Sequence, residues 1–276
     1  MHLSVKFIPA LLLVASAANA ATIDSATLTA IARLQEEKLH ARIGIAVIDT
    51  ASGKSVSYRG DERFPLNSTH KALLCGALLS KVDQQEFALS DTTQFSKETL
   101  VEYSPVTNKF VAPKSMSWQQ LCSAAIEYSD NTAANLLATK LGGPQKVTAW
   151  FAGLGDNVTR LDRSEPELNS AVPGDLQDTT TPLAVSHTLA KLTLGDALKP
   201  ESRAQLVQWM KDDNVADALL RASLPSGWKI GDKTGAGAHG SRSIISVVYI
   251  TQTEATLAQS NDAIARIGKS IFAATH

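Results

Sequence analysis

Four short motifs hold the side chains that could carry out chemistry, and they occur in one order along the chain. They are Ser68-Thr69-His70-Lys71, Ser129-Asp130-Asn131, Glu165-Pro166-Glu167-Leu168-Asn169 and Lys233-Thr234-Gly235. Together they supply a serine nucleophile, two lysines, a second serine, and a carboxylate with an amide partner. A serine that is activated by a neighbouring base can attack an activated amide and form a covalent acyl-enzyme. The set therefore indicates amide hydrolysis by this route.

The first motif places a nucleophile and a base on one helical face. Ser68 and Lys71 are three residues apart, and Pro65 and Asn67 lie where a helix should begin. In the first turn the positive end of the helix dipole is near the serine, whose backbone N–H is still free to donate. Lys71, if deprotonated, could take the hydroxyl proton of Ser68.

Ser129 and Asn131 have two interpretations. They flank Asp130 just before an expected helix that starts at Thr132, so all three residues could be ordinary helix caps. In the functional interpretation, the Ser129 hydroxyl relays a proton to a leaving nitrogen and the Asn131 amide binds the substrate. The residues alone leave both open.

The candidate general base lies in a long irregular segment, 154–180. Glu165 could activate a water molecule that Asn169 positions, and Arg163 with Asp178 could close the loop through an ion pair. Long loops of this kind are usually functional or disordered. The alternative is a solvated charged loop without a catalytic role.

The last motif lies at the end of a predicted strand. Lys233 would supply a fixed positive charge for a substrate carboxylate, and Arg242 could add a second. Glycine at position 235 lets a ligand approach the backbone closely. The backbone N–H groups of Ala236 and Ser68 could together form an oxyanion hole.

The elements that must position these motifs follow from hydrophobic periodicity. We expect a helix over 23–39, strands over 42–48 and 54–59, a mostly helical block over 65–211, β-rich runs over 228–238 and 241–252, and a final helix from about 254. The terminal strands should pair into one antiparallel sheet flanked by the terminal helices. The predicted fold class is α/β (α+β), with 21–60 and 212–276 as an α/β lobe and 61–211 as an inserted all-α lobe. The crevice between the lobes is the natural site.

The N-terminus has the pattern of a signal peptide. Lys6 precedes an apolar run, 7–18, that ends in Ala18-Asn19-Ala20, a small-x-small cleavage pattern. A membrane span needs roughly 20 apolar residues, and this run is shorter. We expect 1–20 to be removed and the protein to be secreted into the periplasm, without a membrane association afterwards. A retained N-terminal anchor is the alternative.

Composition excludes several other classes. The net charge is −1 with both signs interspersed, so we expect no nucleic-acid partner. The six histidines show no ligand-like spacing, and neither a metal nor a cofactor is expected. Cys75 and Cys122 fit an oxidising compartment, where they could form one disulfide or remain two buried thiols.

With these residues in place, the chain resembles the class A serine β-lactamases. The likeness extends from about 41 to 272. Within the family, the sequence is most similar in detail to the broad-spectrum penicillinases of the TEM, SHV and carbenicillinase groups. Beyond the four motifs the likeness includes the segments 101–106, 121–125 and 158–163. The resemblance implies the serine β-lactamase/DD-peptidase-like fold.

The resemblance also implies roles. Ser68 would be the acylated nucleophile and Glu165, through a water held with Asn169, the deacylation base; either Lys71 or Glu165 would drive acylation. Ser129 would protonate the lactam nitrogen. The remaining implied contacts are a carboxylate site at Lys233, Thr234 and Arg242, a pocket lined by Tyr103, Asn131, Gly235 and Ala236, and a family disulfide between Cys75 and Cys122.

The implied activity is hydrolysis of penicillins and early cephalosporins, which gives antibiotic resistance, by a monomer that binds small-molecule β-lactams. Two alternatives stay open. One is a penicillin-binding serine DD-peptidase-like protein that is acylated and then stalls. The other is a poorly folded, inactive deletion variant.

The second alternative comes from one departure from the family. Family members have three consecutive strands before the last helix, whereas here 243–248 runs directly into 249–252 without a turn signal. Compared with the family pattern, about a dozen residues are absent between them. We therefore expect one strand in place of two, a sheet with a strand missing or rearranged, and lower stability than a full-length relative.

Overall fold

The computed structural model describes residues 23–245 and 248–274. The expected signal peptide, 1–20, lies outside these residues. Within the part of the chain that the structure describes, no helix is both long enough and apolar enough to cross a membrane.

A five-stranded antiparallel sheet forms one side of the molecule, in the order β2-β1-β9-β8-β7. The strands are β1 (Arg42–Ile48), β2 (Ser55–Tyr58), β7 (Lys233–Ala236), β8 (Arg242–Ile245) and β9 (Val248–Thr251). The N-terminal hairpin therefore joins the C-terminal strands through the pairing of β1 with β9. This confirms the prediction that strands from both chain ends form one sheet. Because β7 is an edge strand, one side of its backbone is free to face the site.

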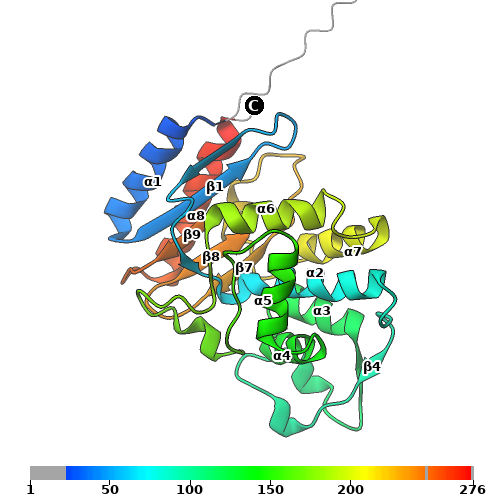
Figure 1. Ribbon diagram of the computed structural model, residues 1–276. Helices are drawn as coiled ribbons and strands as arrows, with labels where there is room; N and C mark the ends of the chain where they lie inside the picture. The colour runs from blue at the N-terminus through cyan, green and yellow to red at the C-terminus, as the bar shows by residue number, and fades with distance from the viewer. Residues whose placement is uncertain (1–22, 246–247, 275–276) are drawn as a thin grey trace, which may run out of the picture.

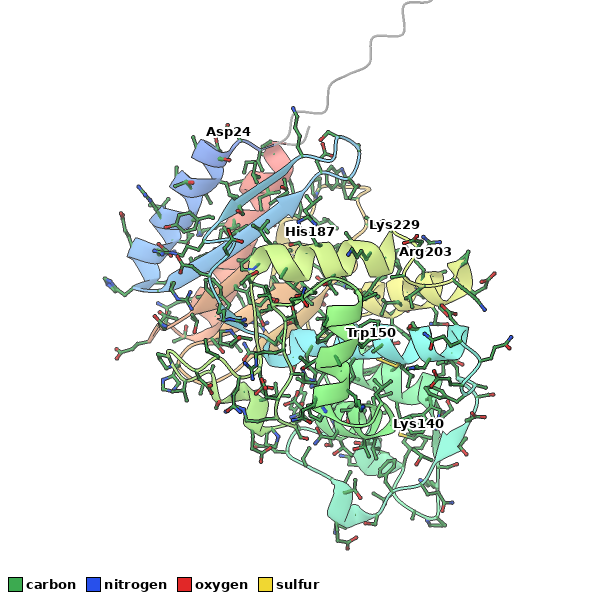
Figure 2. The ribbon with its side chains drawn as sticks, viewed as in Figure 1. Asp24, Lys140, Trp150, His187, Arg203 and Lys229 are labelled. Atoms are coloured by element: carbon green, nitrogen blue, oxygen red, sulfur yellow. A yellow bond between two sulfur atoms is a disulfide. The ribbon has the colours of Figure 1, made fainter. Side chains whose placement is uncertain are left out.

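Two terminal helices, α1 (Ser25–Leu39) and α8 (Leu257–Ala273), contact each other and one face of this sheet. Figure 1 shows α1 in blue and α8 in red beside the strands. Side chains cap both helices: Asp24 accepts from the N–H of Thr27 at the start of α1 (Figure 2), and Thr256 forms a capping box at the start of α8. Such caps satisfy N–H groups that a helix start leaves unpaired.

The sheet separates two hydrophobic cores because successive side chains of a strand point to opposite faces. The face toward α1 and α8 carries Ile43, Ile45, Ile244, Val248 and Ile250. The opposite face adds Ala46, Ile245 and Tyr249 to the core of the helical part. Both faces are therefore apolar, which explains why these strands show near-continuous hydrophobic runs.

The helical part lies between β2 and β7 in sequence and occupies the other side of Figure 1. Its helices are α2 (His70–Asp83), α3 (Trp118–Glu127), α4 (Asn131–Lys140), α5 (Pro144–Gly153), α6 (Pro182–Thr193) and α7 (Pro200–Lys211). The short 3-10 helices are η1 (Asn67–Thr69), η2 (Lys97–Thr99), η3 (Thr107–Lys109), η4 (Glu167–Ser170) and η5 (Leu220–Ser223). Helix α2 is central, since eleven of its residues are buried.

A disulfide joins Cys75 in α2 to Cys122 in α3, 47 residues further along the chain. The bridge ties the helix that follows Ser68 to the helix that precedes Ser129. This confirms the disulfide that the family resemblance implied.

Two-residue strands also pair within the long connections. They are β3 (Phe64–Pro65) with β6 (Thr179–Thr180), and β4 (Thr92–Thr93) with β5 (Met116–Ser117). The β3–β6 pair fixes the end of the loop that carries Glu165 against the chain just before η1.

The prediction of a missing strand is wrong. The run 241–252 folds back on itself as two antiparallel strands, with Ser243 opposite Tyr249 and Ile244 opposite Val248. Strand β9 then pairs antiparallel with β1 through Ile45 and Val248. Two positions between the strands, 246 and 247, lie outside the described residues.

The reversal lets β9 run antiparallel to both of its neighbours, β8 and β1. Strands β8 and β9 have only four residues each, and each half of the run alternates between the two cores. Because the chain folds back, β9 pairs with β8 on one side and with β1 on the other. A single strand in place of β8 and β9 would leave buried backbone N–H and C=O groups of the sheet without partners. The reversal uses no Gly, Pro, Asn or Asp, so the sequence carried no turn signal.

Candidate active site

The nucleophile candidate, Ser68, lies in η1 immediately before α2 and is nearly buried. Asn67 holds this turn in place: its backbone is left-handed, with φ 46°, and its side-chain amide donates to Ser241 Oγ at 2.9 Å. Ser241 lies beside β8, on the opposite side of the cleft. The Asn67–Ser241 contact therefore fixes the position of Ser68 relative to the sheet.

Lys71 follows one helical turn later and is fully buried. Its Nζ lies 3.0 Å from Ser68 Oγ, 2.7 Å from the carbonyl oxygen of Ser129 and 2.5 Å from Asn131 Oδ1. The same nitrogen is 3.4 Å from Ser129 Oγ. One amine therefore connects the first two motifs. The three-residue spacing of Ser68 and Lys71 places the amine beside the serine hydroxyl, as predicted.

Glu165 forms an ion pair with this lysine, with 3.0 Å between Oε1 and Nζ, and both side chains are fully buried. Asn169 donates to Glu165 Oε2 at 2.5 Å. The backbone of Glu165 is held from α4, because Asn135 accepts from its N–H and donates to its carbonyl. The carboxylate is thus fixed from three directions.

Charge interactions decide the protonation of this pair. Burial by itself would raise the pKa of the Glu165 carboxyl, but the charge of Lys71 and the hydrogen bonds from Lys71 and Asn169 outweigh burial, so its pKa lies below the ordinary value. Burial lowers the pKa of the Lys71 ammonium, and the charge of Glu165 opposes that shift. Glu165 is therefore ionised at neutral pH, and Lys71 holds its proton less tightly than a surface lysine does.

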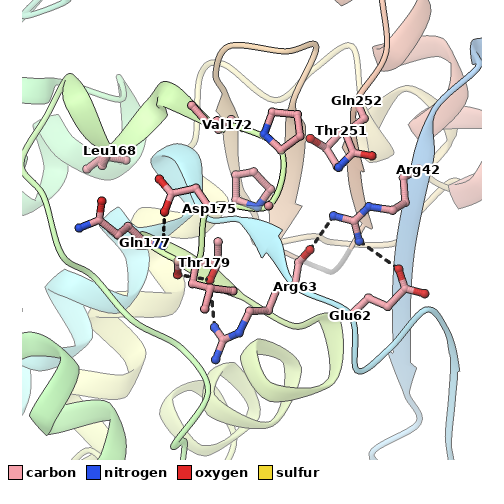
Figure 3. A pocket seen from close by; sticks show the side chains of 15 residues that line it. Arg42, Glu62, Arg63, Leu168, Val172, Asp175, Gln177, Thr179, Thr251 and Gln252 are labelled. Carbon is pink, nitrogen blue, oxygen red and sulfur yellow. Dashed lines mark hydrogen bonds and ion pairs between the residues drawn. The ribbon is translucent and has the colours of Figure 1, made fainter.

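The loop that carries Glu165 is closed by Arg163 and Asp178. Arg163 Nε lies 2.5 Å from Asp178 Oδ2, and the backbone N–H groups of Asp162 and Arg163 both donate to Asp178 Oδ1. Asp178 is fully buried. The outer surface of this loop lines a separate cavity of about 330 Å³, where Arg42 pairs with Glu62 (Figure 3).

Strand β7 faces Ser68 across the cleft. A Cβ at Gly235 would lie only 2.7 Å from the backbone nitrogen of Ser68, so glycine allows the strand to pass this close. The N–H of Gly237 donates to Ser241 on the inner side of the strand. Because N–H directions alternate along an antiparallel strand, the N–H of Ala236 points to the open edge.

Two cations lie behind this strand. Lys233 is fully buried, with its Nζ 3.7 Å from Asp213 Oδ2. Burial lowers the pKa of Lys233 to about 8, although the charge of Asp213 opposes the shift. Arg242 donates to Gly235 O at 2.7 Å and to Asn261 Oδ1 at 2.8 Å, and burial lowers its pKa to about 10. Both are available to attract an anion.

Asp130 is a cap and also a structural anchor. It accepts from the N–H of Ala133 in α4 and, from the 104–107 segment, from the N–H groups of Val106 and Thr107. Ser129 and Tyr103 both have left-handed backbones, with φ 58° and 61°. The carbonyl of Tyr103 accepts from the N–H of Asn131, which holds the backbone that carries the exposed tyrosine ring.

These elements enclose a cleft of about 450 Å³. Its lining includes nine of the sequence-predicted residues: Ser68, Tyr103, Ser129, Asn131, Asn169, Thr234, Gly235, Ala236 and Arg242. The buried side chains of Lys71, Glu165 and Lys233 lie behind this lining. Arg163 and Asp178 lie outside it, in the loop, and Cys75 and Cys122 lie in the helical core.

Sequence reasoning missed several residues of the site. Glu102, Pro166, Val215 and Leu257 line the cleft, and Asn135 and Asp213 hold Glu165 and Lys233. Asn135 is four residues after Asn131, so helical spacing could have placed both on one face. Asp213 gave no comparable signal. Across 23–245 and 248–274, no group of three or more His, Cys, Asp or Glu side chains is arranged to hold a metal.

The chain is similar to known proteins over most of its length. The model of the β-lactamase enzyme family matches residues 26–275. β-Lactamase AER-1 of Aeromonas hydrophila is 52% identical over 258 residues, which cover 89% of this chain and 85% of that protein.

Two solved structures are also similar over nearly the whole fold. An ancestral (GNCA) class A β-lactamase is 47% identical with a TM-score of 0.87, covering 90% of this chain and 99% of that chain. A class A β-lactamase of the last common ancestor of Gram-negative bacteria (GNCA4) is 47% identical with a TM-score of 0.88, covering 91% and 100%. The chain belongs to the class A β-lactamase family. It is a hydrolase that acts on β-lactams.

Proposed function

We propose that the chain opens the β-lactam ring of penicillins and early cephalosporins through an acyl-enzyme on Ser68, and so gives antibiotic resistance. The observation that supports this most strongly is the continuous buried contact from Ser68 Oγ through Lys71 Nζ to Glu165 Oε1, with 3.0 Å at each step. It places a nucleophile, an amine and a carboxylate in successive direct contact beneath the cleft lining.

In the acylation step, Ser68 Oγ attacks the lactam carbonyl carbon and gives its proton to the base. Lys71 is in direct contact with that hydroxyl, which favours it as the immediate acceptor. Because Lys71 is an ammonium in its ion pair, it first passes one of its own protons to Glu165, which returns it when Lys71 later reprotonates Ser129. The N–H groups of Ser68 and Ala236 stabilise the oxyanion. When the carbon–nitrogen bond breaks, Ser129 delivers a proton to the lactam nitrogen, and Lys71 lies within reach to replace it.

In the deacylation step, a water molecule attacks the ester carbonyl and gives its proton to Glu165. The carboxylate is ionised and held by Asn169 and Lys71, as a general base requires. The ester bond then breaks and Ser68 regains its proton. The substrate carboxylate is held by Lys233, Thr234 and Arg242, while Tyr103 and Asn131 contact the rest of the ligand.

Turnover with mass spectrometry tests this function. We expect nitrocefin and benzylpenicillin to be hydrolysed, with no lasting adduct on the wild-type protein. Glu165→Gln should instead accumulate benzylpenicilloyl on the peptide that contains Ser68, and Ser68→Gly should form no adduct. A persistent adduct on the wild-type protein would favour a penicillin-binding peptidase and overturn the hydrolase proposal.

The organisation of the chain is part of the proposal. The two cores support the division into 21–60 with 212–276 and an inserted 61–211. We further propose that 1–20 directs export to the periplasm, that the mature protein starts near Ala21, and that it is a monomer without a nucleic-acid or membrane partner. The mass of the periplasmic product and its elution in size-exclusion chromatography test these statements.

A further inference from the structure

His70 is a buried imidazole beside the proposed general base, Glu165, and it has no role in the proposed mechanism. It is the first residue of α2 and is 2% exposed. Its Nδ1 lies 2.8 Å from the carbonyl oxygen of Asn67. Because a carbonyl oxygen can only accept, Nδ1 carries the proton of the neutral ring. Nε2 is therefore the nitrogen that gains a proton when the ring becomes charged.

This second nitrogen faces the general base. Nε2 lies 4.0 Å from Glu165 Oε1, the same oxygen that Lys71 contacts at 3.0 Å. In the neutral ring two acceptors face each other, so Nε2 gives Glu165 no hydrogen bond. A proton on Nε2 would instead place a second cation beside the carboxylate, at a distance where an opposite charge strongly favours the ionised form.

The charged groups that face His70 come from two elements, the loop that carries Glu165 and helix α2. Glu165 approaches from the loop, Asp178 from the end of that loop, and Lys71 from α2 itself. Burial lowers the pKa of the imidazole and the charge of Lys71 adds to this, while the two carboxylates oppose it. The ring is therefore neutral at pH 7 and becomes charged only in acid.

We propose that His70 is a positioning residue that sets the basicity of Glu165 according to the proton on Nε2. With a neutral ring, Glu165 accepts a proton from the hydrolytic water. With a charged ring, the carboxylate is stabilised and is a weaker base, so hydrolysis of the acyl-enzyme slows. This inference rests on the proposed role of Glu165 in deacylation.

Two substitutions separate the charge of His70 from its structural contact. In His70→Asn the side-chain amide N–H can replace Nδ1–H toward Asn67, but nothing can protonate in the place of Nε2. His70→Phe keeps a ring and removes both functions. His187, which is exposed on α6 (Figure 2), gives the matched control His187→Asn.

The kinetic readout is the deacylation rate between pH 4.5 and 8, followed from preformed acyl-enzyme. We expect the acid limb of the deacylation rate to lie at lower pH in both His70 variants. The ratio of the variant rate to the wild-type rate should therefore be at least about threefold larger at pH 5 than at pH 7. His187→Asn should follow wild type. A uniform loss of rate at every pH, or an acid limb that stays in place in both variants, would mean that the role of His70 is structural only.

A second readout does not require turnover. In protein labelled with ¹⁵N-histidine, the midpoint of the His70 imidazole titration should move to lower pH in Glu165→Gln, because the facing anion is lost. An unchanged midpoint would overturn the proposed coupling. If Glu165→Gln does not accumulate acyl-enzyme, the proposed function fails instead, so the two failures are distinguishable.

Discussion

Lys71 and Glu165 form an ion pair in which both side chains are fully buried and Nζ lies 3.0 Å from Oε1. Buried ion pairs are costly to separate, because the removal of one partner leaves the other charge without compensation. Lys71 touches the nucleophile, and in the proposed mechanism Glu165 is the base for water, so the pair would link the two steps of catalysis. The variants at these two positions should consequently behave differently.

Lys71→Ala should slow acylation of Ser68 by benzylpenicillin by about 10²–10⁴-fold, the usual range for loss of a proton-transfer group. Glu165→Gln should change acylation far less and stop deacylation. Stopped-flow measurement of both steps checks this. Lys81→Ala, on the same helix but at the surface, is the control. Equal losses of acylation in Lys71→Ala and Glu165→Gln would favour Glu165 as the acylation base.

Asp213→Asn should move the alkaline limb of kcat/KM to lower pH. Lys233 has a pKa of about 8, and Asp213 at 3.7 Å helps to keep it charged. As pH rises through this value Lys233 loses its charge, and binding of the substrate carboxylate weakens. Without Asp213 this loss begins at lower pH, so KM at pH 8 should rise while activity at pH 6 changes little. Asp212→Asn, its exposed neighbour, should leave the pH profile unchanged.

Asp178→Asn should loosen the loop that carries Glu165. Asp178 is buried and accepts hydrogen bonds from Asp162 and Arg163 as well as the ion pair. Weakening these charged contacts should lower the free energy of unfolding by about 2 kcal/mol and slow deacylation more than acylation. Urea unfolding and burst kinetics check this. Asp175→Asn, which removes the partly exposed partner of the same arginine, should have a smaller effect.

The double variant Cys75→Ala/Cys122→Ala should lose about 2–4 kcal/mol of unfolding free energy, the typical worth of a disulfide. The bridge lies in the helical core and outside the cleft lining, so kcat at 25 °C should stay close to wild type. Urea unfolding and nitrocefin turnover measure the two quantities. A large fall in kcat with unchanged stability would show that the bridge positions the serines directly.

The short β8–β9 hairpin should make the protein less stable than a full-length class A β-lactamase in which this hairpin is longer, although the sheet is complete. Each strand has four residues, and Ala46, Val47 and Ile48 extend beyond the part of β1 that pairs with β9. We expect cooperative unfolding at a lower urea midpoint than that relative under matched conditions. An equal or higher midpoint would mean that packing by α1 and α8 offsets the shorter strands.

Much of the fold was predictable from local patterns. The helix expected over 23–39 is observed at Ser25–Leu39, and the strand expected over 42–48 is Arg42–Ile48. Periodicity and capping residues determine such elements locally. The antiparallel pairing of β8 with β9 was not predictable, because an apolar run that is buried on both faces has the same sequence pattern whether it continues as one strand or turns back.

The sequence by itself determined the chemistry available to this protein: a serine and a lysine one helical turn apart, a carboxylate with its amide, and a lysine before glycine on a strand. Family resemblance joined these motifs into one site. Only the tertiary structure decided how deeply Lys71, Glu165 and Lys233 are buried, and which groups face them. His70 and Asp213 gain importance for that reason, since pKa values depend on burial and on charges brought close by segments far apart in the sequence.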